Sequence, residues 1–506
     1  MEDYSLNIKT PSVGGYLSSE QIDLLSIIQC KTPEELILFI NECEQINHLT
    51  KDITGINKDN LEEIKEKIFK LYQSTMVNHN SNYHIDLINR LINSGIREED
   101  IGTIISNQKE AKDYIKGKYT NYEEIFEKAH HFISLERDQN KSEDLYEELK
   151  ILNENLSNFD TILIGSGKIS NVYNELSDNN KFDFYHVKRD LDFAWRNGKQ
   201  VRYHSLLVKD CDNLFKGKDK KEILNTIRDY VKESIDFINE YNRTHRISNY
   251  GENLPVINAV DLFNEIISFE KNEKGEYTNI WEDKYGITLE ELLPVFDSAL
   301  QNKPKGVNYL YNEPFLEDED RRKKVIETLE TINSIKPKLI DTLGSQMHIT
   351  ITANEDDIRK CFEDFKKLQD RYNINIQITE FDMSLGRHEI PRVFSINGSI
   401  PDYSLEQVYN LKEQKIESIS NIIQQSKVEL SGVSYWSLTD GIDCNTERLR
   451  DEFLAEGSIN DIDEIKTACG GLFPTYRKHI LNNEIQQMME EHEKDEKTNI
   501  EKIVSY

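Results

Sequence analysis

The chain has 506 residues, which is long for one small domain and predicts one large domain plus an extension. Hydrophobic residues make up 37% and charged residues 30%, and the formal net charge is −30 at pH 7, so a core is expected beneath a strongly acidic surface. Such a surface repels phosphate backbones and argues against a nucleic-acid partner. The short basic run from Lys216 to Lys221 is typical of a solvated helix end.

The segment from Met1 to Leu6 has neither a basic start nor an apolar stretch, so it does not resemble a secretory signal. No apolar run approaches the roughly 20 residues that span a bilayer, and no membrane partner is expected. The six cysteines are scattered without CxxC spacing, which predicts neither a zinc site nor a disulfide framework. These patterns favour a cytoplasmic protein with reduced thiols, and secretion without a signal peptide would leave the same pattern.

Residues 1–150 predict a helical N-terminal region. Apolar residues recur there at three- and four-residue spacing, and strand-like runs are scarce. Helices are expected over Thr32–Asn41, Asn60–Tyr72 and Tyr83–Asn93. The sequence indicates neither the role of this region nor a protein partner for it.

From about residue 155, short β-rich runs alternate with long amphipathic helices. The strand-like runs are Thr161–Ile164, Gln200–Val208, Pro255–Phe263, Gly306–Tyr311, Leu339–Met347, Asn375–Phe381 and Val433–Leu438. The helices expected between and after them are Tyr185–Asn197, Lys221–Tyr241, Leu289–Gln301, Asp320–Ile335, Glu355–Tyr372, Leu405–Ser426 and Tyr476–Glu490. This alternation is typical of parallel strands joined by helical crossovers.

Seven strands are visible, and an eighth would close a (β/α)8 TIM barrel over residues 151–490. His131–Leu135 is a candidate for the missing first strand. A doubly wound open sheet is the alternative, but no GxGxxG motif follows a first strand. Residues 491–506 predict a charged tail. The fold class expected is therefore α/β, a TIM barrel with an α-helical N-terminal extension.

Function in such a barrel sits at the C-terminal ends of the strands. Two strand-like runs end in glutamates there, Glu265 and Glu380. Hydrolysis of a glycosidic bond needs one carboxyl that protonates the leaving oxygen and one that attacks the sugar or activates water. In a retaining mechanism these carboxyls lie about 5–5.5 Å apart. Further polar or aromatic residues at the same strand ends are His204, Asn264, Asn312, Glu313, Gln346, His348 and Trp436.

Several of these side chains suit binding of a sugar. Asn264 could hold a sugar hydroxyl, His348 could keep Glu380 ionised, and Trp436 could stack on a pyranose ring. Gln346 lies two residues before His348 and would face the same side of an extended strand. Each residue alone also has an ordinary structural interpretation, and Glu313 before a proline is typical of a loop carboxylate. The joint pattern is what predicts a site.

Motifs over about residues 160–480 resemble a known family. They are Val201-Arg202-Tyr203-His204-Ser205-Leu206, Asp261-Leu262-Phe263-Asn264-Glu265, Gly344-Ser345-Gln346-Met347-His348, Ile378-Thr379-Glu380-Phe381-Asp382 and Tyr435-Trp436-Ser437-Leu438-Thr439-Asp440. In order and spacing they resemble the family-10 glycoside hydrolases, the retaining endo-β-1,4-xylanases.

The resemblance implies that Glu380 is the nucleophile and Glu265 the acid/base. It implies that one sugar subsite is lined by His204, Asn264, Gln346, His348 and Trp436. It also implies a β-linked oligo- or polysaccharide as the partner, and no metal or organic cofactor.

The sequence departs from the family pattern at three places. The tryptophan that usually follows the third-strand histidine by four residues is replaced by Val208. The second-strand segment, rich in Glu, Asn, Lys and Trp in the family, is poorly matched from Gly165 to Val172. An aromatic residue expected soon after Asp440 is missing near Cys444. These losses would remove stacking and hydroxyl contacts.

Two competing hypotheses stay open at this point. The first is a catalytically silent family-10-like barrel that binds carbohydrate or protein, which the eroded aromatic positions favour. The second is a barrel enzyme of another chemistry, such as an aldolase or an enolase-type enzyme. The lack of a strand-end lysine or of a three-carboxylate metal set argues against the second.

Overall fold

The computed structural model describes residues 13–43, 53–79, 156–173, 181–208, 211–249, 252–350, 353–384 and 405–436, with a few short stretches besides. Its chain divides into two compact units. One comprises Asp23–Asn153 with Arg450–Asn460, and the other comprises the remaining residues. Among the described helices, none combines the length and the apolarity that a membrane span requires.

Eight parallel strands close into a barrel in the larger unit. They are β1 (Val13–Leu17), β2 (Thr161–Ile164), β3 (Gln200–Tyr203), β7 (Ile257–Asn264), β8 (Asn308–Glu313), β9 (Thr342–Ser345), β11 (Asn375–Ser384) and β12 (Leu430–Tyr435). The ring closes because β9 pairs with β11 and β1 pairs with both β12 and β2. The predicted TIM barrel is confirmed.

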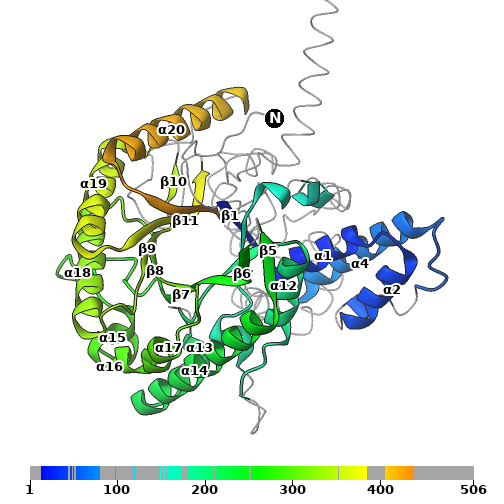
Figure 1. Cartoon of the computed structure of the whole chain (residues 1–506), viewed down its shortest axis with the longest axis horizontal. Coiled ribbons are helices and arrows are strands. Elements are labelled where there is room, and N and C mark those ends of the chain that lie inside the picture. Colours follow the sequence, from blue (N-terminus) through cyan, green and yellow to red (C-terminus); the bar gives the residue numbers. More distant parts are fainter. Residues whose placement is uncertain are drawn as a thin grey trace, which may run out of the picture. The chain divides into compact units, whose positions relative to one another are not determined.

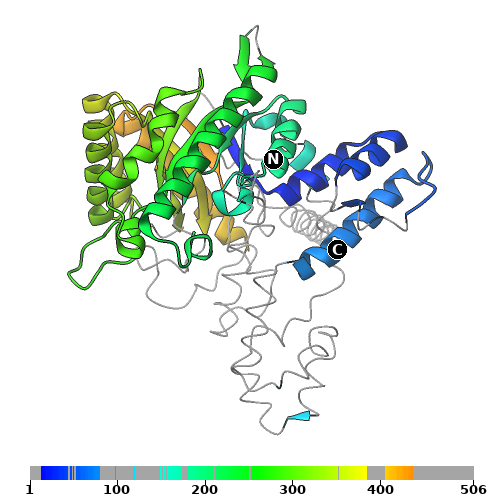
Figure 2. The same ribbon diagram turned by 90° about the horizontal axis from the view of Figure 1, so that it is seen from below.

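Helices surround the strands, as Figure 1 shows. They are α11 (Ile169–Val172), α12 (Tyr185–Arg196), α13 (Asp212–Phe215), α14 (Lys220–Thr244), α15 (Ile280–Tyr285), α16 (Leu289–Leu292), α17 (Asp297–Gln301), α18 (Glu319–Ile335), α19 (Glu355–Tyr372) and α20 (Leu405–Ser426). Figure 2 shows the long green α14 lying across the outside of the strands.

Local sequence signals set several helix boundaries. A capping box of Asp219 and Glu222 starts α14, because each side chain accepts from the other's backbone N–H. Asp318 caps α18 and Asn354 caps α19, each through one hydrogen bond that its side chain accepts from a backbone N–H of the first turn. Asn373, in the left-handed conformation, ends α19. These caps explain why the bounds of α14, α18 and α19 lie close to the predicted ones. The predicted helix Leu289–Gln301, in contrast, divides into α16, a 3-10 helix over Leu293–Phe296 and α17.

The strands are shorter than predicted or displaced at several ends. The predicted run Gln200–Val208 divides into β3 and the two-residue β4 (Leu207–Val208), with His204 at the break. The run Leu339–Met347 contains β9, and a separate strand β10 (His348–Thr350) follows it. An antiparallel hairpin of β5 (Arg246–Asn249) and β6 (Glu252–Pro255) precedes β7. The breaks after β3 and β9 fall beside two residues predicted for the site, His204 and Gln346.

The first barrel strand is β1, which lies before the helical region rather than after it. The described helices of that region are α1 (Ser19–Gln29), α2 (Pro33–Glu42) and α4 (Leu61–His79). Most of the helical region therefore connects β1 to β2 along the chain, whereas the sequence pattern predicts all of it ahead of the barrel. The candidate first strand His131–Leu135 lies outside the described residues.

The smaller unit contains buried apolar side chains. Leu36 and Ile40 on α2 are buried, as are Ile64 and Phe69 on α4. A capping box of Thr32 and its N3 glutamate starts α2, with a proline at its first position. The predicted segments Tyr83–Asn93, Tyr476–Glu490 and 491–506 lie outside the described residues.

Candidate active site

Glu380 is a buried carboxylate on β11, with 2% of its surface exposed. The amide of Asn312, on β8, donates to Glu380 Oε1 over 2.7 Å. The imidazole of His348 lies on the other oxygen, with Nε2 3.3 Å from Glu380 Oε2. The guanidinium of Arg202 lies 3.7 Å from Oε1. Both oxygens therefore have positively polarised neighbours.

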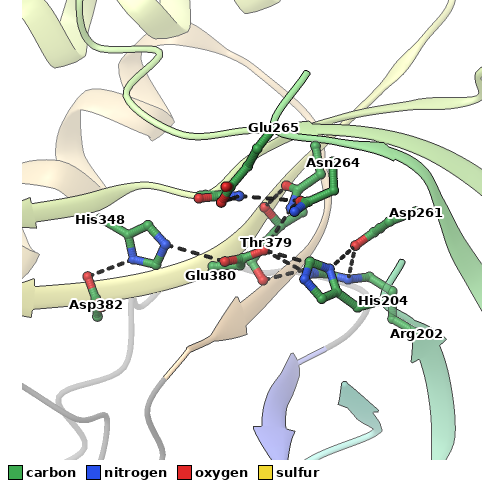
Figure 3. A network of polar contacts seen from close by, with 11 residues as sticks. Arg202, His204, Asp261, Asn264, Glu265, His348, Thr379, Glu380 and Asp382 are labelled. Carbon is green, nitrogen blue, oxygen red and sulfur yellow. Dashed lines mark hydrogen bonds and ion pairs between the residues drawn. The ribbon is translucent and has the colours of Figure 1, made fainter. Parts of the chain in front are cut away.

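These neighbours keep Glu380 ionised. Burial alone would raise the pKa of Glu380, but the hydrogen bond from His348 and the charges of His204, His348 and Arg202 lower it to about 2. Burial likewise opposes a charge on His348, yet Asp382 and Glu380 together raise the pKa of His348 well above its ordinary value. Asp382 Oδ1 lies 2.9 Å from His348 Nδ1. The row Glu380–His348–Asp382 thus holds a carboxylate, a cation and a second carboxylate (Figure 3).

A second buried charge cluster lies beside Glu380. His204 Nδ1 is 2.7 Å from Asp261 Oδ2, and Arg202 Nε is 3.4 Å from the same oxygen. Arg202 Nη1 also donates to the backbone oxygen of Thr379 over 3.0 Å. This cluster fixes the orientation of the His204 ring next to Glu380, whose Oε1 lies 3.9 Å from His204 Nδ1.

Glu265 follows β7 and is joined to Glu380 by a chain of side-chain amides (Figure 3). Gln346 Nε2 donates to Glu265 Oε1 over 3.0 Å and lies 3.4 Å from Asn264 Oδ1. Asn312 Nδ2 donates both to Asn264 Oδ1, over 2.8 Å, and to Glu380. Two carboxyl groups that are far apart along the chain therefore meet in one network.

Gln346 and His348 reach the site by a different backbone path from the one predicted. The sequence pattern predicts both on one extended strand. Met347 between them adopts the left-handed conformation, with φ 60°, and separates β9 from β10. Gln346 consequently contacts Glu265, while His348 contacts Glu380.

Trp436 follows β12 and is partly exposed. Its ring meets His204 and His348 edge-on, with centroid distances of 6.0 and 6.1 Å. The ring of Tyr16 on β1 stacks on it, with centroids 4.5 Å apart and an interplanar angle of 19°. Trp436 therefore lies against the site, and Tyr16 covers one of its faces.

Glu313 differs from its prediction as a loop carboxylate. It is the last residue of β8 and is 0% exposed. Arg321 Nη2 donates to its Oε2 over 2.8 Å. Burial raises the pKa of Glu313 to about 7, and Arg321 opposes this rise. Pro314 after it does not prevent burial, because the strand carries Glu313 inward.

The structure brings together all the site residues that the sequence predicted: His204, Asn264, Glu265, Gln346, His348, Glu380 and Trp436. It adds Asn312 and Glu313, which the sequence predicts at strand ends without a role, and five residues without any predicted place in the site: Tyr16, Arg202, Asp261, Thr379 and Asp382.

Two sequence signals could have identified some of these additions. Arg202 and Asp261 are charged residues inside apolar strand runs, and a buried charge needs a partner. Asp382 is two residues after Glu380 on an extended strand, so it shares its face. No comparable signal marks Tyr16. Among the described residues, no group of three or more His, Cys, Asp and Glu side chains is arranged to hold a metal ion.

Comparisons with known proteins identify a family. Residues 165–451 match the model of glycosyl hydrolase family 10. The chain is 26% identical over 281 residues to endo-1,4-beta-xylanase A of Thermotoga neapolitana, covering 54% of this chain and 23% of that protein. It is 26% identical over 263 residues to a beta-1,4-xylanase of Dictyoglomus thermophilum, covering 51% of this chain and 66% of that protein.

The chain thus spans less than two thirds of the length of either curated relative. The crystal structure of xylanase XynB from Paenibacillus barcinonensis is similar with a TM-score of 0.45 at 17% identity, covering 58% of this chain and 83% of that one.

Proposed function

Since the chain belongs to glycosyl hydrolase family 10, we propose that it is a retaining glycoside hydrolase that cleaves β-1,4-linked xylan or xylo-oligosaccharides by double displacement. Glu380 is the nucleophile and Glu265 the acid/base. The observation that carries this proposal is the amide chain through Gln346, Asn264 and Asn312 that joins the two carboxyl groups.

The first step breaks the glycosidic bond. The Glu380 carboxylate attacks the anomeric carbon, and the bond to the leaving oxygen breaks as Glu265 gives that oxygen a proton. In the second step Glu265, now a carboxylate, takes a proton from water. The resulting hydroxide attacks the anomeric carbon and releases Glu380. Two inversions at one carbon retain the β configuration.

The neighbours of Glu380 suit a nucleophile. With its pKa lowered to about 2, Glu380 is a carboxylate at neutral pH and needs no prior deprotonation. His348 is held as a cation between Glu380 and Asp382, so it stabilises the carboxylate that re-forms when the intermediate breaks down.

The remaining side chains suit one bound sugar. The Oδ1 of Asn264 accepts from Asn312, which leaves the amide nitrogen of Asn264 to donate to a sugar hydroxyl. His204 is anchored to Asp261 by one ring nitrogen and offers the other to the sugar. Trp436 supplies a ring for stacking on the face that Tyr16 does not cover.

The roles of the two glutamates are tested with azide and an aryl β-xyloside that carries a good leaving group. Glu380→Ala should lose turnover, and azide should restore it by direct displacement, which gives the α-xylosyl azide. Glu265→Ala should still form the intermediate, which azide intercepts with a second inversion to give the β-xylosyl azide. NMR of the two products distinguishes these outcomes, and identical products from both variants would contradict the assignment.

Wild-type activity decides between enzyme and binding module. A product-resolved screen on β-xylans and β-glucans should give xylo-oligosaccharides. If the wild type turns over no aryl β-glycoside and no polysaccharide, the enzyme hypothesis fails. Calorimetric binding of xylo-oligosaccharides without any product would then support the silent barrel.

A further inference from the structure

The backbone of Glu265 adopts a conformation that needs outside support. Its φ is 56°, in the left-handed region that non-glycine residues rarely occupy. Such a conformation persists only when the surrounding structure fixes it. The N–H of Glu265 donates to the backbone oxygen of Asn312 over 3.0 Å. That bond holds one side of the residue, and the support on the other side comes from the segment that follows.

A buried carboxylate binds the segment after Glu265. The N–H groups of Ile266 and Ile267 both donate to Glu313 Oε1, over 2.7 and 3.1 Å. Glu313 is the last residue of β8, so a rigid strand positions these bonds. The two amides directly after Glu265 are thereby fixed to a single oxygen atom.

A buried guanidinium binds the same segment through its carbonyls. Arg321 Nη2 donates to the oxygen of Ile267 over 3.1 Å and to Glu313 Oε2 over 2.8 Å, and Nη1 donates to the oxygen of Ser268. Its Nε donates to the oxygen of Pro314 over 2.8 Å. Arg321 is 1% exposed and lies in the first turn of α18. Glu313 thus holds the N–H groups of Ile266 and Ile267, and Arg321 holds the carbonyl oxygens of Ile267 and Ser268.

We infer that Glu313 and Arg321 form a positioning pair that fixes the Glu265 carboxyl for proton transfer and tunes its protonation by their charges. This role rests on the proposed function, in which Glu265 is the acid/base. Neither residue of the pair needs to touch the sugar.

The charges around the pair define its electrostatic effect. Glu313 is affected by Arg321, by Glu265 and by the phenol of Tyr311. On the other side of Glu265, the amide chain leads to Glu380, which is surrounded by His204, His348 and Arg202. A negative charge on Glu313 disfavours ionisation of Glu265, whereas the positive charge of Arg321 favours it.

The test exploits these opposite signs. Above its pKa of about 7 Glu313 carries a negative charge, and Glu313→Gln removes that charge and leaves Arg321 unbalanced. The alkaline limb of the pH profile of kcat/KM should therefore move to lower pH by about half a unit or more. Arg321→Gln should move the same limb to higher pH. A residue with only a structural role would lower activity without moving the limb in opposite directions. Glu313→Asp, which keeps the charge, should restore the wild-type limb.

The leaving group supplies a second readout. Dinitrophenyl β-xyloside needs little protonation of its leaving oxygen, whereas phenyl β-xyloside needs it fully. Glu313→Gln and Arg321→Gln should each lower kcat/KM about 10- to 100-fold on the phenyl substrate and much less on the dinitrophenyl substrate. The reason is that a misplaced acid loses most of its contribution to the rate of bond cleavage. Equal losses on both substrates with an unmoved limb would overturn the inference.

Arg322 offers a matched control on the same helix. It is 2% exposed, it pairs with Asp364 over 2.9 Å and it donates to the backbone oxygens of Leu316 and Glu317. Arg322→Gln should destabilise the fold comparably without a limb shift or a leaving-group effect. If it reproduces both effects, the inference fails.

The azide test checks the proposed function separately. If the wild type and Glu265→Ala give the results expected there, but the variants of Glu313 and Arg321 show neither a limb shift nor a leaving-group effect, only the role of the pair is overturned. A wild type that turns over neither aryl xyloside overturns the proposed function, and the role of the pair with it.

Discussion

Glu380 keeps a negative charge inside the barrel because His348 and Arg202 lie against it and Asn312 donates to it. Burial works in the opposite direction, so the lowered pKa depends on these few contacts. Because the folded pKa lies below the ordinary value of 4.5, the charge of Glu380 stabilises the fold above that pH, and the stabilisation is lost as the pH falls toward 2.

Replacing His348 with Gln should make activity sensitive to mild acid. The substitution removes the positive charge of His348 and its hydrogen bond to Glu380, both of which lower the pKa of Glu380. The effect of burial, which raises this pKa, is then less compensated, so the pKa of Glu380 rises. With a dinitrophenyl β-xyloside, wild-type kcat/KM should stay level from pH 6 down to about 4, whereas the variant should lose activity below about pH 5. Melting curves at each pH serve as the control. A variant that is uniformly slower but has a level profile would contradict this explanation.

At the scale of elements, the site depends on close packing between neighbouring strands. Gly344 on β9 lies between Asn312 on β8 and Thr379 on β11, where those side chains form a hydrogen bond. A Cβ at Gly344 would lie 2.7 Å from Asn312 Oδ1 and 2.7 Å from Thr379 Cγ2. Glycine is required at this position because a larger residue would push the amide chain away from Glu380.

Gly344→Ala should therefore damage both fold and function. We expect a loss of about 1–3 kcal/mol in the free energy of unfolding, the usual cost of overpacking. Activity of the molecules that remain folded should fall as well, because Asn312 shifts. Urea unfolding and kcat measurements check this, with Asn308→Ala on the exposed start of β8 as the control. An unchanged free energy of unfolding would show that β8, β9 and β11 can move apart at no cost in stability.

At the scale of the whole molecule, the barrel is assembled from chain segments far apart in sequence. The five residues of β1 pair with β12 on one side and with β2 on the other. Most of the helical region therefore separates β1 from β2 along the chain instead of preceding a complete barrel. The N-terminal strand is needed for closure of the barrel, because without it β12 and β2 each lose a neighbouring strand.

Deleting Met1–Leu17 should abolish the cooperative folding of the barrel. Removing β1 leaves the facing edges of β12 and β2 unpaired. We expect aggregation or a broad, weak thermal transition by circular dichroism. Deleting only Met1–Thr10 keeps all of β1, which begins at Val13, and should preserve the transition. If the variant without Met1–Leu17 unfolds in a thermal transition as sharp as that of the wild type, another segment can take the place of β1.

The alternation of strands and helices from residue 155 and the position of two glutamates at strand ends can be predicted from the sequence, because hydrophobic periodicity and helix caps are local signals. The family resemblance also groups seven site residues. The individual bonds between these side chains follow from the tertiary structure alone. The amide chain between Glu265 and Glu380 joins residues from β7, β8, β11 and the segment after β9, and the pairing of Glu313 with Arg321 joins a strand to a helix. The strand at Val13–Leu17 was missed for the same reason. It is too short and too glycine-rich to be recognised alone, and only its parallel partners define it.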